Sequence, residues 1–167
     1  MIYGFPPIVD EQCRVLVLGS MPSVVSLERQ QYYGHKQNYF WPMLFSLLEE
    51  PYRDDYSKKK DLLLRHHIAL WDVLDSCEIE GASDASIRNP VPNRMREILD
   101  CAPIEAIFCT GQKAGTLFKR YCQKDCAIQA RVLPSTSPAN CAVKLEQLLE
   151  RYAVIRQSTD RRKQTKP

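Results

Sequence analysis

Short apolar runs alternate with amphipathic stretches along this chain. Runs rich in branched aliphatic and aromatic residues predict buried strands at 14–18, 66–71, 104–109 and 128–133. Apolar residues at helical spacing predict helices at 38–50, 58–65, 111–121 and 142–155, with one or two helical turns at 95–100. Strands that alternate with helices predict an α/β fold, in which helices cover both faces of a parallel sheet.

Two parts of the chain break this alternation. The stretch 76–94 lacks periodicity and contains Gly81, Pro90 and Pro92, so it predicts a long surface loop. The segment 156–167 carries five basic residues against Asp160, and we expect a basic, disordered tail that binds phosphates or is simply solvated. With no internal repeat or linker, residues 1–155 form a single domain.

Composition narrows the class of protein. Of the 167 residues, 44% are apolar and 26% charged, as in soluble globular domains, and no apolar run approaches the roughly 20 residues of a membrane span. Seven irregularly spaced cysteines indicate free thiols in a reducing compartment, and no Cys/His cluster completes a metal site. The N-terminus shows no secretory leader. We therefore expect a cytoplasmic monomer without a metal or membrane contact.

Candidate chemistry should follow the strands, because ligands of open α/β sheets bind beyond the carboxyl ends of the strands. The segment Gly19-Ser20-Met21-Pro22-Ser23 follows the first strand, and its amides and hydroxyls could cradle a phosphate or a polar base edge. It is not a Walker loop, because no Gly-Lys-Ser/Thr follows. Taken alone, it is only a strand-ending turn.

A second segment, 32–41, combines aromatic residues, a glycine and polar amides directly before an amphipathic helix. Tyr33 could stack on a base, and Asn38 could position a water or bind a sugar. Asn38 could equally cap the helix, and Phe40 and Trp41 are expected in the core. A third segment, Pro134–Asn140, places three hydroxyls between two prolines before the last helix, which suits phosphate binding or a stiff connection.

Together these segments resemble the uracil-DNA glycosylase superfamily, most closely its hypoxanthine-DNA (deoxyinosine) branch, with motifs like those of its mismatch-specific branch. The similar stretches are Gly19-Ser20-Met21-Pro22-Ser23, His35-Lys36-Gln37-Asn38-Tyr39-Phe40-Trp41 and Val132-Leu133-Pro134-Ser135-Thr136-Ser137-Pro138-Ala139. Their order and strand context agree over 14–155. The resemblance implies a three-layer α/β/α fold with a four-stranded parallel sheet. It also implies a monofunctional enzyme that flips a deaminated base out of DNA and cuts its N-glycosidic bond.

The resemblance also implies roles for particular residues. Asn38 would position the attacking water, and Ala139 stands where the family places its wedge into the base stack. The base pocket would contain Ser20, Met21, Tyr33, Trp71 and Asp72. The DNA phosphates would be held by Gly19, Ser23, Lys113, Ser135 and Ser137.

This chain departs from the family pattern at two site positions. Met21 stands where the superfamily usually has an Asp or Asn that orients water. Ala139 replaces the usual leucine wedge, and a methyl group is a poor plug. A single N-terminal Cys13 does not match the paired cysteines of the iron–sulfur branches, so we expect no cofactor.

Three alternatives remain open at this point. A uracil or G:T/U mismatch glycosylase would share the fold but act on another base. A catalytically silent DNA-binding module would explain the missing carboxylate at Met21. An unrelated hydrolase has little support, because the chain has no Gly-x-Ser-x-Gly nucleophile elbow.

Overall fold

The computed structural model describes residues 1–79, 86–140 and 142–164, and its centre is a four-stranded parallel sheet. The strand order is β3 (Ile68–Asp72), β2 (Val15–Gly19), β6 (Ala106–Thr110) and β7 (Ala130–Leu133). Every residue of β2 and β3 is buried, which is why both strands appear in the sequence as unbroken apolar runs. The predicted parallel sheet is confirmed.

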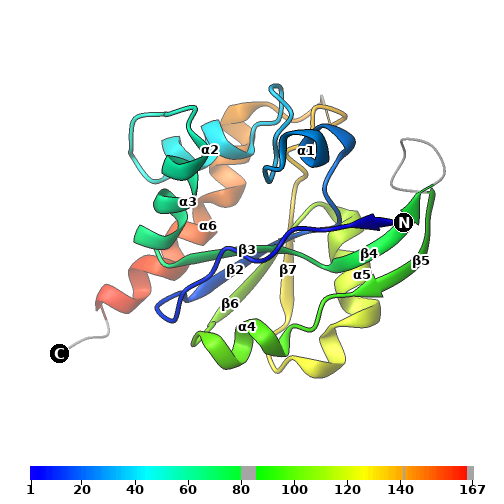
Figure 1. Cartoon of the computed structure of the whole chain (residues 1–167). Coiled ribbons are helices and arrows are strands. Elements are labelled where there is room, and N and C mark those ends of the chain that lie inside the picture. Colours follow the sequence, from blue (N-terminus) through cyan, green and yellow to red (C-terminus); the bar gives the residue numbers. More distant parts are fainter. Residues whose placement is uncertain (80–85, 141, 165–167) are drawn as a thin grey trace.

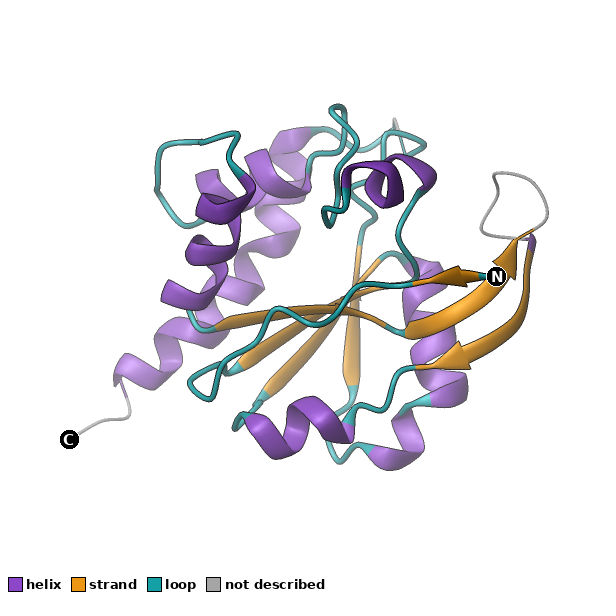
Figure 2. Cartoon of the chain, in the orientation of Figure 1, coloured by secondary structure: helices purple, strands orange, loops and turns teal. Residues whose placement is uncertain are grey.

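Helices cover both faces of this sheet, as predicted. Figures 1 and 2 show α2 (Phe40–Leu47), α3 (Tyr56–Arg65) and α6 (Leu145–Gln164) on one side, and α4 (Arg96–Cys101) and α5 (Gln112–Tyr121) on the other. Two separate apolar clusters fill the two interfaces. Alternate strand residues feed them: Ile68 and Leu70 belong to the α2–α6 side, whereas Ala69 and Trp71 belong to the α4–α5 side.

The loop predicted over 76–94 is wrong in its described part. Residues Leu74–Ile79 form β4 and Ile87–Pro92 form β5, and the two strands pair antiparallel in a second sheet with β1 (Ile2–Tyr3). Two register shifts along the β4–β5 pairing interrupt the alternation that would have marked these strands. Both prolines are tolerated because β5 is an edge strand.

The disordered tail predicted from residue 156 is also wrong as far as the structure describes it, because α6 continues to Gln164. Ile155 is buried, and the Arg156 guanidinium donates to the carbonyl oxygen of Leu47 and to the carboxylate of Glu49. These contacts anchor the helix beyond the expected domain end. Residues 165–167 lie outside the described chain.

Candidate active site

Strands β3, β2 and β6 end side by side, and their last residues face the α2–α6 side of the sheet. Gly19 of β2 is in register with Asp72 of β3, and Thr110 closes β6 on the other side of β2. The chain leaves β2 toward β3 but later returns to β6 on the opposite side, so β2 and β6 flank the topological switch point. Open α/β sheets bind their ligands at such a point.

Gly19 is a close-approach position. A Cβ atom there would lie 2.7 Å from Oδ1 of Asp72 and 3.1 Å from the hydroxyl oxygen of Tyr33. Real Cβ atoms do not approach other atoms to 2.7 Å, so only glycine lets this carboxyl and this phenol meet over the end of β2. This is a packing requirement, whereas the sequence had suggested a phosphate cradle at Gly19.

Asp72 is a buried acid in an unusual state. Only 4% of the residue is exposed, and its Oδ2 has no hydrogen-bond partner in the described structure. Burial raises the pKa of the Asp72 carboxyl from its usual 3.8 to about 7. Perturbed groups of this kind gather at functional sites, because a structural carboxylate would be paired.

Tyr33 is held in a fixed orientation beside this acid. Its hydroxyl lies 2.8 Å from Oγ1 of Thr110, which in turn donates to the carbonyl oxygen of Leu18 over 3.3 Å. The Tyr33 ring stacks on Phe40, with 3.9 Å between ring centroids and 17° between planes. Burial raises the pKa of the Tyr33 hydroxyl, so it stays protonated and can donate to Thr110. Tyr33 adopts φ 52°, a left-handed conformation that is rare outside glycine.

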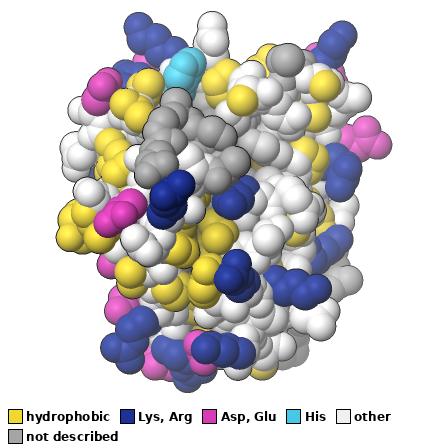
Figure 3. Space-filling view, turned by 90° about the vertical axis from the view of Figure 1, so that its right-hand side faces the viewer, with side chains coloured by type: hydrophobic (Ala, Val, Ile, Leu, Met, Phe, Trp, Pro, Cys, Tyr) yellow, Lys and Arg dark blue, Asp and Glu magenta, His cyan; other side chains and the backbone are white. Residues whose placement is uncertain are grey.

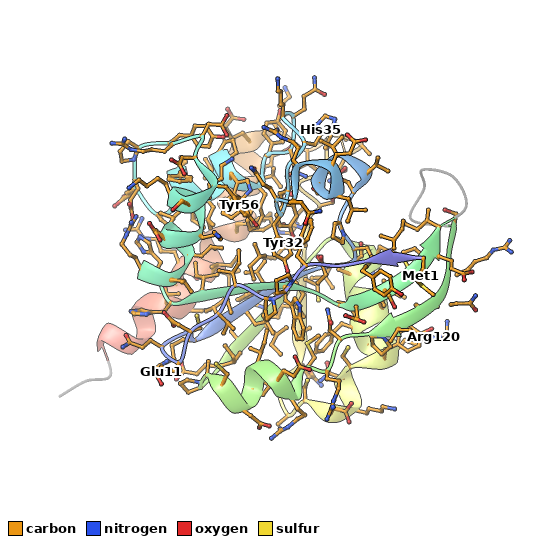
Figure 4. All side chains as sticks on the ribbon, in the orientation of Figure 1. Met1, Glu11, Tyr32, His35, Tyr56 and Arg120 are labelled. Atoms are coloured by element: carbon orange, nitrogen blue, oxygen red, sulfur yellow. The ribbon has the colours of Figure 1, made fainter. Side chains whose placement is uncertain are left out.

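Asn38 lies at the start of α2. Its Oδ1 accepts from the backbone N–H of Phe40 at 2.9 Å, and its own N–H donates to the carbonyl oxygen of His35. The N-cap residue of α2 is nevertheless Tyr39, which has no side-chain cap, so Asn38 bonds the first helical N–H from one residue before the cap position that the sequence suggested for it. The side-chain amide nitrogen has no partner within the described chain and stays available as a donor. Figure 4 shows His35 at the outer end of this segment and Tyr32 in the interior beneath it.

The serine-rich loop is bonded both to itself and to the Asn38 segment. The Ser135 hydroxyl accepts from the N–H of Ser137, and the Ser137 hydroxyl accepts from the N–H of Ala139. The Tyr39 N–H donates to the carbonyl oxygen of Thr136 at 3.1 Å. From α6, the buried Tyr152 donates its hydroxyl to the carbonyl oxygen of Pro134 at 2.5 Å. Two motifs about a hundred residues apart thus form one rigid unit.

The start of α5 adjoins the serine loop. Gly111 precedes this helix with φ 108°, and a Cβ there would lie 3.2 Å from the Cβ of Ser135. No side chain caps α5, so its first N–H groups stay free to bind an anion, and Lys113 stands in the first turn. A hollow of about 610 Å³ lies beside the serine loop, lined by Gln112, Val132, Leu133, Pro134, Ser135, Ser137, Ala139, Asn140 and Arg151.

Several predicted site residues lie elsewhere. Trp71 is buried in the opposite apolar cluster, and its indole N–H donates to the carbonyl oxygen of Phe5. The Met21 side chain packs against the same cluster, whereas the Ser20 carbonyl oxygen accepts from the N–H of Leu74. The Ser23 hydroxyl caps the N-terminus of α1 (Val24–Arg29). The structure therefore brings together Gly19, Tyr33 and Asp72, but not the side chains of Trp71 and Met21.

Thr110 was missed by sequence reasoning. The available signal was its position directly after the strand predicted at 104–109 and directly before the helix-opening Gly111. Within the described residues no group of three or more metal-binding side chains occurs. Nor does any helix in that part of the chain have the length and apolar character needed to cross a membrane.

Comparisons with known proteins agree with this fold. The family model of the uracil DNA glycosylase superfamily matches residues 6–157. A hypoxanthine DNA glycosylase of Methanosarcina barkeri is 38% identical over 67% of this chain and 72% of its own length. Another protein of that name, from Methanosarcina acetivorans, is 34% identical over 92% of this chain and 97% of its own. A solution NMR structure from the same organism, provisionally named a uracil DNA glycosylase, is 34% identical and superposes with a TM-score of 0.81, covering 93% of this chain and 97% of that one.

Proposed function

Because the chain belongs to the uracil-DNA glycosylase superfamily and is a DNA glycosylase, we propose that hypoxanthine is the base it removes from DNA. The observation that carries the choice of base is the 34% identity, over nearly the full length of both chains, to a protein named for hypoxanthine. The enzyme would act as a monomer in the cytoplasm.

The base would enter beside Asp72 and stack on Tyr33. Phe40 already covers one face of the Tyr33 ring and Thr110 fixes its hydroxyl, so the ring is a preformed platform. The lactam edge of hypoxanthine has an N1–H donor next to a C6 carbonyl acceptor. A protonated carboxyl offers an acceptor and a donor at matching spacing, which is the support for Asp72 as the base reader.

Cleavage would use water that is positioned by Asn38. Positive charge develops on the sugar and negative charge on the base, and the DNA phosphates stabilise the former. The free amide nitrogen of Asn38 could orient a water, although an amide cannot abstract its proton. No lysine stands in the cluster of Gly19, Asp72, Tyr33 and Thr110 as a Schiff-base nucleophile. We therefore propose a monofunctional enzyme that leaves an intact abasic strand.

The flanking phosphates would lie between the α5 start and the serine loop. Lys113 and the free N–H groups of α5 supply positive potential, and Ser135 and Ser137 supply hydroxyls. Over the face that carries β4, β5 and α5, lysine and arginine side chains are spread widely (Figure 3), which favours approach of a polyanion. Ala139 is exposed near the end of this loop and would face the vacated stack.

Uracil is the second candidate base, because its N3–H and C4 carbonyl present the same donor and acceptor pair as hypoxanthine. The test is base release from duplex and single-stranded oligonucleotides that carry hypoxanthine, uracil, xanthine or mismatched thymine, with alkali used to reveal abasic sites. Faster release of hypoxanthine supports the proposal, and faster release of uracil overturns the choice of base. Intact DNA binding without any release would identify a silent module.

A further inference from the structure

The buried carboxyl at the end of β3 has a chemical task beyond reading the base. We propose that Asp72 works in its protonated form and donates its carboxyl proton to the base as the glycosidic bond breaks. This inference rests on the proposed function of the site as the hypoxanthine pocket.

The surroundings of Asp72 favour the neutral acid. Gly19 of β2 lies against Oδ1, and Oδ2 is the one buried carboxylate oxygen in the described chain that lacks a hydrogen bond. Three phenols interact electrostatically with the Asp72 carboxyl: Tyr33 beside it, Tyr32 in the same segment as Tyr33, and Tyr56 of α3. Asp72 forms no ion pair within the described residues, so nothing there stabilises its ionised form.

The phenols are poorer proton donors than Asp72, because two of them already donate elsewhere and burial raises the pKa of all three. Tyr33 is hydrogen-bonded to Thr110, and the Tyr32 hydroxyl donates to the carbonyl oxygen of Pro6 at 2.9 Å. The Tyr56 oxygen accepts from the Tyr32 N–H. Burial also raises the pKa of both Tyr32 and Tyr56. Asp72 is thus the acid in this cluster whose pKa lies near neutrality and whose oxygen is unengaged.

The departing base decides which form of Asp72 is productive. When the bond from C1′ to N9 breaks, its electron pair stays on the base, and the negative charge spreads over the ring nitrogens and O6. An ionised Asp72 would repel this charge in its buried surroundings, whereas the neutral acid donates to it. Asn38 cannot supply this proton, so its role on the water and the role of Asp72 on the base are complementary.

The step balances. The proton leaves the Asp72 carboxyl and bonds to the base, so neutral hypoxanthine departs. Water forms the new bond from oxygen to C1′ and releases one proton, which returns through solvent to the Asp72 carboxylate. The products are free base, an abasic sugar and the regenerated acid, and no metal or redox partner takes part.

The experiment measures single-turnover release of hypoxanthine between pH 5.5 and 8.5 for the wild type, Asp72→Asn and His35→Gln. The Asn variant keeps a donor of similar shape but cannot titrate. His35 is the histidine of the segment 32–41, and its ring nitrogen Nδ1 accepts from the Gln37 N–H, so His35→Gln is the control for a contribution of a nearby imidazole to the pH profile. Circular dichroism verifies that each variant is folded.

We expect the wild-type rate to be constant below pH 6 and to fall about 30-fold from pH 6 to pH 8.5, following the protonated fraction of an acid with a pKa of about 7. Asp72→Asn should lower the rate at pH 6 by about 10² to 10⁴-fold, with no further decline at higher pH. His35→Gln should keep the wild-type profile.

A wild-type rate that is constant or rises with pH, or a decline that persists in Asp72→Asn, would overturn the role of Asp72 while leaving the glycosylase intact. Loss of the decline in His35→Gln would assign it to the histidine and overturn the proposal as well. No hypoxanthine release by the wild type at any pH would instead refute the proposed substrate, and the proton donor with it.

Discussion

Asp72 should make the folded protein less stable as the pH rises, and Asp72→Asn should remove that loss. The pKa of the carboxyl is about 7 in the folded state against 3.8 for the same group in water. Well below pH 3.8 the group is protonated in both states and has no effect. Between pH 4 and 7 the unfolded chain releases a proton that the folded chain retains, so the free energy of unfolding falls with rising pH. Above pH 7 the full loss remains.

The size of this loss follows from the two pKa values. Each unit of difference is worth about 1.36 kcal/mol, so raising the pKa from 3.8 to about 7 corresponds to about 4 kcal/mol. Domains of this size are stable by only about 5–15 kcal/mol, so the effect should be measurable. The unfolding free energy of Asp72→Asn minus that of the wild type should therefore grow by about 4 kcal/mol between pH 4 and pH 8.5.

Urea unfolding followed by tryptophan fluorescence at four or five pH values measures this difference. Other acids, such as Glu50 and Asp54, have lowered pKa values and destabilise both proteins equally in acid, so they cancel in the comparison. Asp75→Asn is the matched control, because Asp75 is exposed on β4 and undergoes the same chemical change. A difference between Asp72→Asn and the wild type that stays constant from pH 4 to 8.5 would refute the burial argument.

Three further substitutions test the site. Asn38→Ala should lower base release roughly hundredfold, with DNA binding retained, and should cost about 1 kcal/mol of stability through the lost hydrogen bond to the Phe40 N–H. Full activity in a single-turnover assay would exclude Asn38 as the water-positioning residue. Gly19→Ala should abolish base release and lower the unfolding free energy by about 1–3 kcal/mol, because the added methyl group would collide with Asp72. An unfolding free energy that calorimetry finds unchanged would contradict the close approach. Tyr152→Phe removes the hydrogen bond to Pro134, which should lower the unfolding free energy by about 1 kcal/mol and weaken binding to abasic-site DNA. Unchanged affinity in a fluorescence anisotropy titration would show that the serine loop needs no such anchor.

The sequence was a good guide to the sheet and a poorer one to its edges. Strands β2 and β3 are buried on both faces, so their apolar runs are unbroken and easily recognised. The β4–β5 hairpin was missed because register shifts disturb its alternation and prolines on an edge strand resemble a loop. The end of α6 was misplaced because basic residues were taken as a sign of disorder, although Arg156 anchors the helix to α2.

The sequence likewise predicted some residues of the site and missed or misplaced others. The rule for parallel sheets led us to expect the functional residues beyond the strand ends, and Tyr33 and Asp72 do meet there. Trp71 was grouped with Asp72 because a strand buried on both faces has no polar alternation that separates neighbours onto opposite sides. Thr110 was missed because its role depends on a hydrogen bond to Tyr33, 77 residues away in the chain.

The arrangement around Gly19 offers a physical explanation for the methionine in the first motif. Met21 points toward the α4–α5 side and packs in its apolar cluster, so it contributes no polar group to the pocket. Directly across Gly19, however, β3 ends in a carboxyl that is enclosed and close to its neutral form at pH 7. A carboxyl at position 21 that turned toward the pocket and was ionised would raise the pKa of Asp72 further by like-charge repulsion. Its negative charge would also oppose the charge that develops on the departing base. An apolar residue at position 21 and a protonated acid at position 72 thus both keep negative charge away from the departing base.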